Sequence, residues 1–575
     1  MSKPVRTTVF ALVAGIALPL AAAEAASRHA TDLLKYVPAD TPYVFVSLEP
    51  LPDKVADKFE PTVDRIMLAY QRVIRYTMEQ KLSEGAVGDD DAGEIEKIRS
   101  LVDEVLGLMS VKGIRDIGIQ RDSVFAFYGH GLLPVLRLRL SDEKLFDQAI
   151  ARIEGKAEKQ LTVGNVSDET YKYLELEGVR LAIATLDGYA VLTVVPAEFD
   201  ESQLAVVFGL DKPRKSLAKS RELRSIAKQY GFTDYFAGFV NNERIASAFV
   251  DEPTGLNEAL LALFDYDAAV LPDACKSEFV EVAGIAPRMV FGYSELNDKY
   301  IDSEVIVELR SDIAKGLATL PATVPGLGQD YGGLVSLGFS VNPLAARQFY
   351  ESRLDALEAD PFECEMLAGV QNGVPAGREV LNKPVPPVVY NFRGFLAVVS
   401  DIQGMDIASE KPPESIDASL LVAIENAQDL VTMVAMLDPQ IAALNLLPDG
   451  KPVKLEIAQL TEFASQAFAA LSEGAVAVSV GEGSEANAAN MLVADGSNPA
   501  PLFSMSMDVS RYYGFIGEAM MEAGPDEGEE EMPVEVRNAM RDVMTLLGDL
   551  YKRMHLDVRM TERGIEMGSH LTLAD

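Results

Sequence analysis

The chain has no tryptophan, only four histidines and only two cysteines, and these shortages limit its chemistry. Without tryptophan a sugar-stacking site is weakened, although tyrosine and phenylalanine could substitute. The histidines are His29, His130, His555 and His570, and they show no metal-ligand spacing among themselves or with the cysteines. The G-x-S-x-G pentapeptide of α/β-hydrolases does not occur. We therefore assign no catalytic residue, metal or cofactor from the sequence.

Two histidine positions carry specific expectations. His130 lies between two glycines and is the histidine to test as a general base, with a simple turn residue as the alternative. His555 and His570 fall in the last predicted hairpin and could face each other across its strands. No third ligand is spaced nearby, so we expect an ordinary surface pair rather than a metal site.

Positive charge is also scarce. The chain has 51 lysines and arginines against 88 aspartates and glutamates, a formal net charge of −37. A surface this negative repels nucleic acid phosphates and anionic lipid headgroups, so no nucleic-acid partner is expected. Two acidic runs, at residues 89–91 and 526–531, lack the ligand spacing of an EF-hand loop and are expected to be solvated loops.

The N-terminus has the three-part layout of a secretory signal peptide. Lys3 and Arg6 form a basic head, residues 9–20 form an apolar run, and cleavage sites follow at Ala23 and Ala25. The run is too short for a membrane anchor, which needs roughly 20 apolar residues. No cysteine follows it, so lipidation is not expected, and no later segment offers an uninterrupted spanning run. The predicted location of the mature chain is the periplasm, with residues 1–25 removed.

Both cysteines lie in the exported portion, where a disulfide can form. Cys275 and Cys364 each follow a proline by three residues, at a plausible first helical turn. Pairing would close a loop of roughly 90 residues and contribute about 4 kcal/mol. The alternative is two separate buried thiols, and we favour the disulfide.

The fold class predicted is α+β, with repeated strand–helix–hairpin units that form antiparallel sheets covered by helices. Residues 133–140 alternate apolar and basic side chains, as in a half-buried strand, and Ser141 and Asp142 can cap a following helix. The same order is expected to start again at residues 43–48, 235–240, 333–341, 420–424 and 502–507. Either one unit was duplicated or a common pattern recurs by chance.

Turn signals predict the hairpins of these units. Asp187-Gly188 separates two apolar runs, a strong hairpin signal. A strand at residues 388–392, a turn at Arg393-Gly394 and a strand at residues 395–400 form a second prediction. The last hairpin is expected at residues 555–560 and 565–573.

Proline and glycine mark two boundaries. Residues 316–333 hold two prolines and several glycines, which predicts a linker between an N-terminal half at 26–315 and a C-terminal half at 334–575. The disulfide would then fix one half against the other. Residues 409–416, with two adjacent prolines, form a weaker boundary.

Residues 481–486 formally match G-x-G-x-x-A, a pattern that can bind a dinucleotide pyrophosphate. Glu482 and Glu485 occupy this loop and would repel the phosphate. The unit pattern predicts a hairpin turn here instead, so no dinucleotide is expected.

Residues 34–46, LKYVPADTPYVFV, follow the signal peptide closely. This segment resembles the start of uncharacterised exported bacterial proteins that are classified as a domain of unknown function. The resemblance implies an envelope location and assigns no activity and no functional residues.

Three functions agree with these patterns. The first is a non-enzymatic periplasmic protein that binds an envelope partner or supports envelope structure. The second is a carrier of an apolar or lipid ligand, suggested by methionines 520, 521, 540 and 544, for which an ordinary core is the alternative. The third is an unrecognised hydrolase that uses His130.

Overall fold

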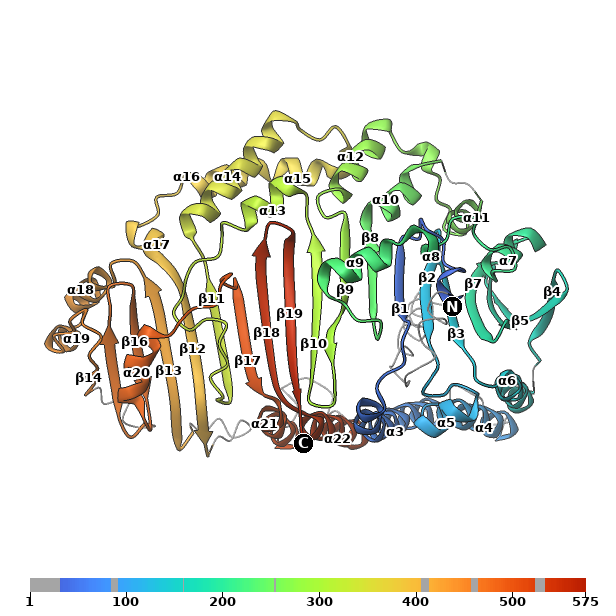
Figure 1. Ribbon diagram of the computed structural model, residues 1–575, viewed down its shortest axis with the longest axis horizontal. Coiled ribbons are helices and arrows are strands. Elements are labelled where there is room, and N and C mark those ends of the chain that lie inside the picture. The colour runs from blue at the N-terminus through green and yellow to red at the C-terminus, as the bar shows by residue number, and fades with distance from the viewer. Residues whose placement is uncertain are drawn as a thin grey trace. The chain divides into compact units, whose positions relative to one another are not determined.

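The computed structural model describes residues 32–83, 92–158, 160–252, 255–404, 413–456, 464–522 and 533–575. The predicted signal peptide and both acidic runs lie outside these residues. With 42% helix and 28% strand, the structure confirms a mixed α+β class (Figure 1). The chain divides into two compact units, one formed by Met1–Phe239, Pro253–Tyr266 and Leu296–Asp298, the other by Val240–Glu252, Asp267–Glu295 and Lys299–Asp575.

The first unit is built on an antiparallel sheet with strand order β8-β1-β2-β3-β7-β6-β5-β4. Its strands are β1 (Tyr43–Ser47), β2 (Phe125–His130), β3 (Leu133–Arg139), β4 (Thr162–Val166), β5 (Glu169–Leu176), β6 (Val179–Leu186), β7 (Tyr189–Pro196) and β8 (Ala237–Asn241). The predicted turn at Asp187-Gly188 joins β6 to β7, and both residues have the positive φ that such a turn needs.

Helices lie on both faces of this sheet. They are α3 (Asp53–Ser83), α4 (Ala92–Leu108), α5 (Val111–Asp116), α6 (Glu143–Ala157), α7 (Glu201–Val207), α8 (Leu217–Ser220), α9 (Glu222–Tyr230) and α11 (Leu256–Ala262). Asp142 caps α6, as predicted, because its side chain accepts a hydrogen bond from the backbone N–H of Lys144. Phe146 of α6 packs on one face of the sheet with Ala190.

The opposite face of the first sheet is the more deeply buried one. Val46 of β1 pairs with Ala126 of β2, which pairs with Arg137 of β3. Residues paired across antiparallel strands point to the same face, so these three side chains form one row. All three are fully buried or nearly so.

The second unit contains an antiparallel sheet with strand order β9-β10-β19-β18-β17-β11-β12-β13-β16-β15-β14. The strands are β9 (Arg288–Leu296), β10 (Tyr300–Glu308), β11 (Val335–Ser340), β12 (Phe392–Gln403), β13 (Ser415–Ile424), β14 (Val453–Lys454), β15 (Ala467–Leu471), β16 (Ala475–Val480), β17 (Phe503–Asp508), β18 (Tyr551–Thr561) and β19 (Gly564–Leu573). β18 and β19 form the predicted last hairpin.

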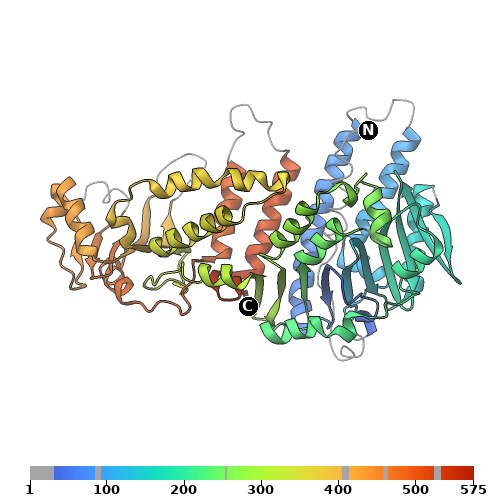
Figure 2. The same ribbon diagram turned by 90° about the horizontal axis from the view of Figure 1, so that it is seen from above.

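The helices of the second unit alternate with these strands. They are α10 (Asn242–Val250), η1 (Ala268–Val270), α12 (Asp273–Ala283), α13 (Ser311–Leu317), α14 (Pro343–Ala359), η2 (Glu365–Leu367), α15 (Ala368–Asn372), α16 (Val374–Asn382), α17 (Pro387–Asn391), α18 (Ala427–Leu437), α19 (Pro439–Ala443), α20 (Ser484–Val493), α21 (Val509–Glu522) and α22 (Val534–Leu550). Figure 2 shows α21 and α22 packed side by side. No helix in the described part of the chain is both long and apolar enough to cross a membrane.

The predicted linker at residues 316–333 lies inside the second unit, so the halves 26–315 and 334–575 do not coincide with the compact units. The physical reason is packing. Val324 and Leu327 are each 1% exposed and belong to a core cluster with Leu396 of β12 and Leu421 of β13. The glycines and prolines of residues 316–333 therefore form a packed connection and not a flexible linker between two domains.

The predicted strand at residues 388–392 is wrong, since these residues form helix α17 and the start of β12. Pro387 occupies the first helical turn, where its missing N–H costs nothing. Gly394 is not in a turn but within β12, at φ +144°, where the pairing with β13 shifts by one residue. A Cβ at this glycine would lie 2.0 Å from the carbonyl oxygen of Phe339.

Candidate functional site

A pocket of about 410 Å³ opens in the first unit between β1, β8 and helix α9. Its floor is apolar and consists of Leu34, Val46, Leu48, Leu223, Ala227, Phe232 and Ala237. The other lining residues are charged: Arg224, Lys228 and Asp234. This volume falls in the range of small-molecule sites, and an apolar wall with a few polar groups is their usual composition.

Helix α9 supplies one wall of the pocket because its sequence is amphipathic. Leu223, Ile226 and Tyr230 recur at helical spacing and are buried. Arg224 and Lys228 are one turn apart, exposed, and both line the pocket. The helix therefore places two cations beside an apolar floor.

Asp234 lies across the pocket from this wall. Burial raises the pKa of Asp234 above its ordinary value, and the positive charge of Arg224 opposes this shift. Burial also raises the pKa of Glu49, and the negative charge of Asp234 adds to that effect. The backbone carbonyl of Asp234 accepts hydrogen bonds from the N–H groups of Leu48 and Glu49, at 2.8 and 2.9 Å, which fixes this side of the pocket.

Arg137 lies two strands away from the pocket wall, in the row formed with Val46 and Ala126. At about 4.8 Å per strand, its backbone is roughly 10 Å from that of Val46. Its side chain is 0% exposed. The guanidinium carbon lies 3.8 Å from the ring centre of Tyr36, and Nη2 donates a hydrogen bond to the carbonyl of Phe208 at 2.5 Å.

The Tyr128 hydroxyl lies beside this guanidinium: burial raises the pKa of Tyr128, while the charge of Arg137 and a side-chain hydrogen bond with it oppose the shift. Nε and Nη1 of Arg137 are buried, and within the described residues neither makes a well-aligned hydrogen bond. A buried cation without a paired carboxylate is costly, so the rings of Tyr36 and Tyr189, the Phe208 carbonyl and the Tyr128 hydroxyl stabilise it. The sequence pattern predicted residues 133–140 as a half-buried strand, and the structure turns Arg137 toward the core.

His130 is largely buried and lies without a hydrogen-bonded nucleophile among the described residues. Burial lowers the pKa of His130 to about 4, although the charge of Asp40 opposes the shift. Its Nε2 atom is buried and has no hydrogen-bond partner among the described residues. A general base needs a nucleophile or a substrate proton within hydrogen-bond reach, and no described side chain donates one to this nitrogen.

His555 and His570 do face each other, as directly paired residues of β18 and β19. Each contacts a carboxylate instead of a shared metal: His555 Nε2 lies 3.3 Å from Asp557, and His570 Nδ1 contacts Asp302. The described residues contain no group of three metal-ligating side chains.

A serine lies beside His555 but is not joined to it. Ser506 pairs with His555 in the register of β17 and β18. The Ser506 hydroxyl lies 2.7 Å from the hydroxyl of Ser336, a buried hydrogen-bonded pair, while Nδ1 of His555 has no partner among the described residues. This arrangement lacks the serine-to-histidine hydrogen bond of a catalytic triad.

At residues 481–486 the structure has a helix rather than the predicted hairpin turn, since α20 begins at Ser484 directly after β16. The dinucleotide pattern still does not fit. The neighbours of β16 are β13 and β15, both antiparallel, whereas a Rossmann unit needs parallel strands. The Asp417 carboxylate accepts the Glu482 N–H at 2.8 Å and occupies the position a phosphate would need.

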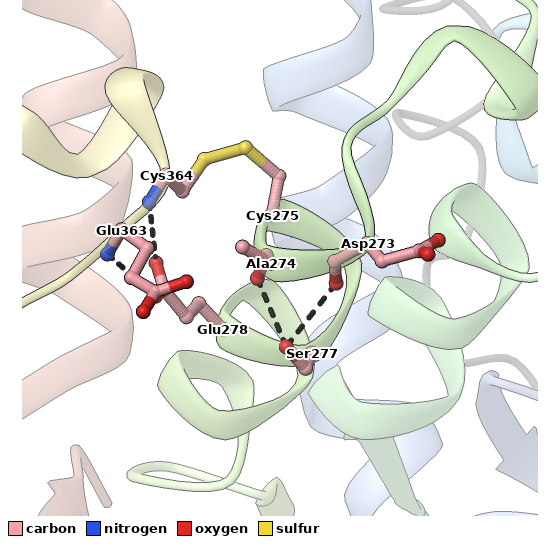
Figure 3. The surroundings of a disulfide bond; sticks show 7 residues. All are labelled: Asp273, Ala274, Cys275, Ser277, Glu278, Glu363 and Cys364. Carbon is pink, nitrogen blue, oxygen red and sulfur yellow. Dashed lines mark hydrogen bonds between the residues drawn. A yellow bond between two sulfur atoms is a disulfide. The ribbon is translucent and has the colours of Figure 1, made fainter.

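The predicted disulfide is confirmed, with 2.08 Å between the sulfurs of Cys275 and Cys364. Cys275 lies in the first turn of α12, and Cys364 directly precedes η2. Glu278 of α12 accepts the backbone N–H groups of Glu363 and Cys364, at 2.7 and 3.0 Å (Figure 3). Both cysteines belong to the second unit, so the bridge does not join the predicted halves as two bodies.

The structure describes two of the four methionine side chains of the carrier hypothesis. Met540 and Met544 are half-buried on α22, and the side chains of Met520 and Met521 lie outside the description. The pocket lies in the first unit instead. The amphipathic pattern of residues 222–230 could have indicated α9, but its contact with β1 joins segments about 180 residues apart.

Comparisons with protein-family models, with curated proteins and with solved structures found no match to this chain. The resemblance of residues 34–46 to exported proteins therefore stays a prediction.

Proposed function

We propose that the protein is an exported, non-enzymatic binding protein whose first unit carries a small amphipathic ligand. The observation that carries this proposal is the pocket between α9, β1 and β8. Its apolar floor fits a hydrocarbon portion, since each buried methylene contributes about 0.8 kcal/mol. The proposal keeps the carrier hypothesis and moves its site to the first unit.

The charged side chains at this pocket favour an anionic head on the ligand. Arg224 and Lys228 present two positive charges, while burial pushes Asp234 toward its neutral form. A carboxylate or phosphate placed between the two cations would gain charge-assisted hydrogen bonds. A fatty acid or a lysophospholipid has this combination of groups.

The experiment is a binding titration with 11-(dansylamino)undecanoic acid, a fluorescent fatty acid. Ala227 is half-buried and lines the pocket, so Ala227→Trp should fill it. We expect the Kd of the probe to rise at least about tenfold, which corresponds to about 1.4 kcal/mol. Ser225→Trp, on the exposed side of the same helix, is the matched control and should leave the Kd unchanged.

A second arm tests the polar end. Arg224→Gln with Lys228→Gln should weaken binding of the acid and leave binding of the corresponding alcohol unchanged. Equal Kd values for Ala227→Trp and wild-type protein would show that the fatty acid does not bind in the pocket. Native mass spectrometry of protein taken from the periplasm would then show whether any ligand is carried at all.

A periplasmic location is part of the same proposal. The paired cysteines support it, because disulfides persist in oxidising compartments. We do not propose a hydrolase, since His130 is largely buried and the Ser506 hydroxyl is hydrogen-bonded to that of Ser336. An ester and phosphoester screen with His130→Ala as the control tests that choice, and activity lost in the variant would reverse it.

We also infer that the strand–helix–hairpin segments arose by duplication. In three cases a strand is followed by helices and then by two strands, the first of which pairs with it: β1 with β2 and β3, β11 with β12 and β13, and β17 with β18 and β19. In a similar local sequence, proline pairs at 38/42 and 321/325 precede β1 and β11, the first strands of two of these cases. Related sequences that keep the pattern at only one of these positions would count against duplication.

A further inference from the structure

Seven exposed cations are concentrated in residues 212–228 of the first unit. They are Lys212, Arg214, Lys215, Lys219, Arg221, Arg224 and Lys228, and we call them the basic strip. Glu222 is the single acidic residue in this range, so the segment has a net charge of +6 in a chain whose net charge is −37. The total charge of the chain conceals this local reversal of sign.

The basic strip is held firmly on the folded unit. Ser216 and Leu217 between its cations are 2% and 1% exposed. The carbonyl of Lys215 accepts the N–H of Ala39 at 3.0 Å, and the N–H of Leu217 donates to Val37 at 2.8 Å. The cations therefore project from a fixed backbone and not from a free loop.

On α9 the basic strip runs along one helical face. Arg224 and Lys228 are four residues apart on the same side of the helix, and Arg221 immediately precedes its first turn, at φ +61°. Two of these three also line the pocket. The cationic face and the apolar floor are thus continuous at the pocket mouth.

We propose that the basic strip docks the protein on a bilayer surface that contains anionic phospholipid, from which the pocket draws its ligand. Charge complementarity selects the occupant, because each lysine or arginine near such a surface raises the affinity about fivefold. The strongly negative remainder of the chain is repelled by the same surface, so docking through the strip has a single preferred orientation. Uptake of a ligand from the bilayer by the pocket rests on the proposed function, whereas docking of the basic strip does not.

The test is sedimentation with sucrose-loaded vesicles, either pure phosphatidylcholine or phosphatidylcholine with 30% phosphatidylglycerol. The test variant is Arg214→Glu/Lys215→Glu/Lys219→Glu, which leaves the pocket residues untouched. Its affinity for the anionic vesicles should fall roughly 100-fold. The matched control reverses three exposed lysines on α5 and α6, Lys112→Glu/Lys144→Glu/Lys156→Glu, and should change the affinity less than threefold, with neutral vesicles unbound in every case.

Two further outcomes decide the inference. Ala227→Trp should bind vesicles as the wild type does while losing the fluorescent fatty acid, so failure of the pocket and failure of docking give different results. Equal loss in both triple variants would overturn a specific strip, because only net charge would then matter. Binding to soluble polyglutamate but not to anionic vesicles would replace the membrane by an acidic protein partner and overturn the proposal.

Discussion

At the scale of single residues, the first unit buries two ionisable side chains with unusually little support. Arg137 is 0% exposed, and Nη2 donates a hydrogen bond to the carbonyl of Phe208. His130 keeps an unpartnered nitrogen and a pKa of about 4. Such groups make stability sensitive to conservative substitution and to pH.

Arg137→Met should be tolerated better than Arg137→Lys. Methionine removes the buried charge at the cost of one donor to the Phe208 carbonyl, whereas lysine keeps a strongly hydrated ammonium that cannot stack on Tyr36 as the guanidinium does. We expect the free energy of unfolding of the lysine variant to be about 2 kcal/mol lower than that of the methionine variant. Urea unfolding followed by tyrosine fluorescence measures this.

The control for Arg137 is Arg139→Met on the same strand, where the side chain is half-exposed. Its change in unfolding free energy should stay below about 1 kcal/mol. A lysine variant as stable as the wild type would mean that the guanidinium geometry is unimportant.

His130 should make the first unit less stable in mild acid. Its folded pKa of about 4 lies below the ordinary 6.5, so the unfolded chain takes up the proton first as the pH falls. The neutral folded form costs nothing at pH 7, and about 2 kcal/mol of stability is lost between pH 7 and pH 5. The loss continues until the pH reaches about 4.

The measurement is urea unfolding of wild type and His130→Gln at pH 7 and pH 5. Carboxylates titrate in both proteins. The difference between the two proteins in how far the free energy of unfolding falls from pH 7 to pH 5 therefore isolates the histidine. The glutamine variant should lose about 2 kcal/mol less than wild type over this interval. Parallel pH profiles would show that His130 is exposed to solvent in the folded protein.

At the scale of elements, the main structural links of the second unit join segments distant in sequence. Cys275 and Cys364 are 89 residues apart, and Glu278 binds the chain beside the same bridge. Gly394 permits β12 to pass the end of β11, where any Cβ would collide with the carbonyl of Phe339.

Removing the disulfide should weaken the second unit. Cys275→Ala/Cys364→Ala frees a loop of 89 residues and should cost about 4 kcal/mol. Guanidinium unfolding of the variant, and of wild type with dithiothreitol, should give matching curves. Glu278→Ala should cost less, and its effect should not add to that of the cysteine variant because both act on one junction.

Gly394→Ala should destabilise the second unit by about 3 kcal/mol or more, since it combines a positive φ with a 2.0 Å approach to a carbonyl oxygen. Gly474→Ala is the matched control, because nothing lies within 4 Å of its Cβ position. Melting temperatures from circular dichroism compare the two. Similar melting temperatures would contradict the backbone conformation described for β12.

At the scale of the whole molecule, charge is distributed unevenly. The chain has a net charge of −37, yet the segment at residues 212–228 has a net charge of +6 beside an apolar pocket. A net-charge argument predicts that anionic lipids are repelled. The basic strip, which includes cations of α8 and α9, supports attraction of anionic lipids to one surface of the first unit.

Export is the prediction that concerns the whole chain. N-terminal sequencing of the protein recovered from the periplasm should begin at Glu24 or Ala26, since a signal peptidase cuts after small residues. Replacing Val13 by Arg in the apolar run should leave the precursor in the cytoplasm with its cysteines reduced. An intact Met1 in periplasmic protein would contradict cleavage.

The sequence by itself determined the α+β class, most strands, the cap at Asp142 and the cysteine pair, because these depend on short-range periodicity, local hydrogen bonding or the count of cysteines. It did not place residues 388–394, where two prolines start a helix ahead of a glycine-bearing strand. Only the tertiary structure decided that Arg137 faces the core, because alternation defines two faces of a strand but not which one is covered. The pocket likewise required α9 to meet β1, a contact that no local pattern encodes.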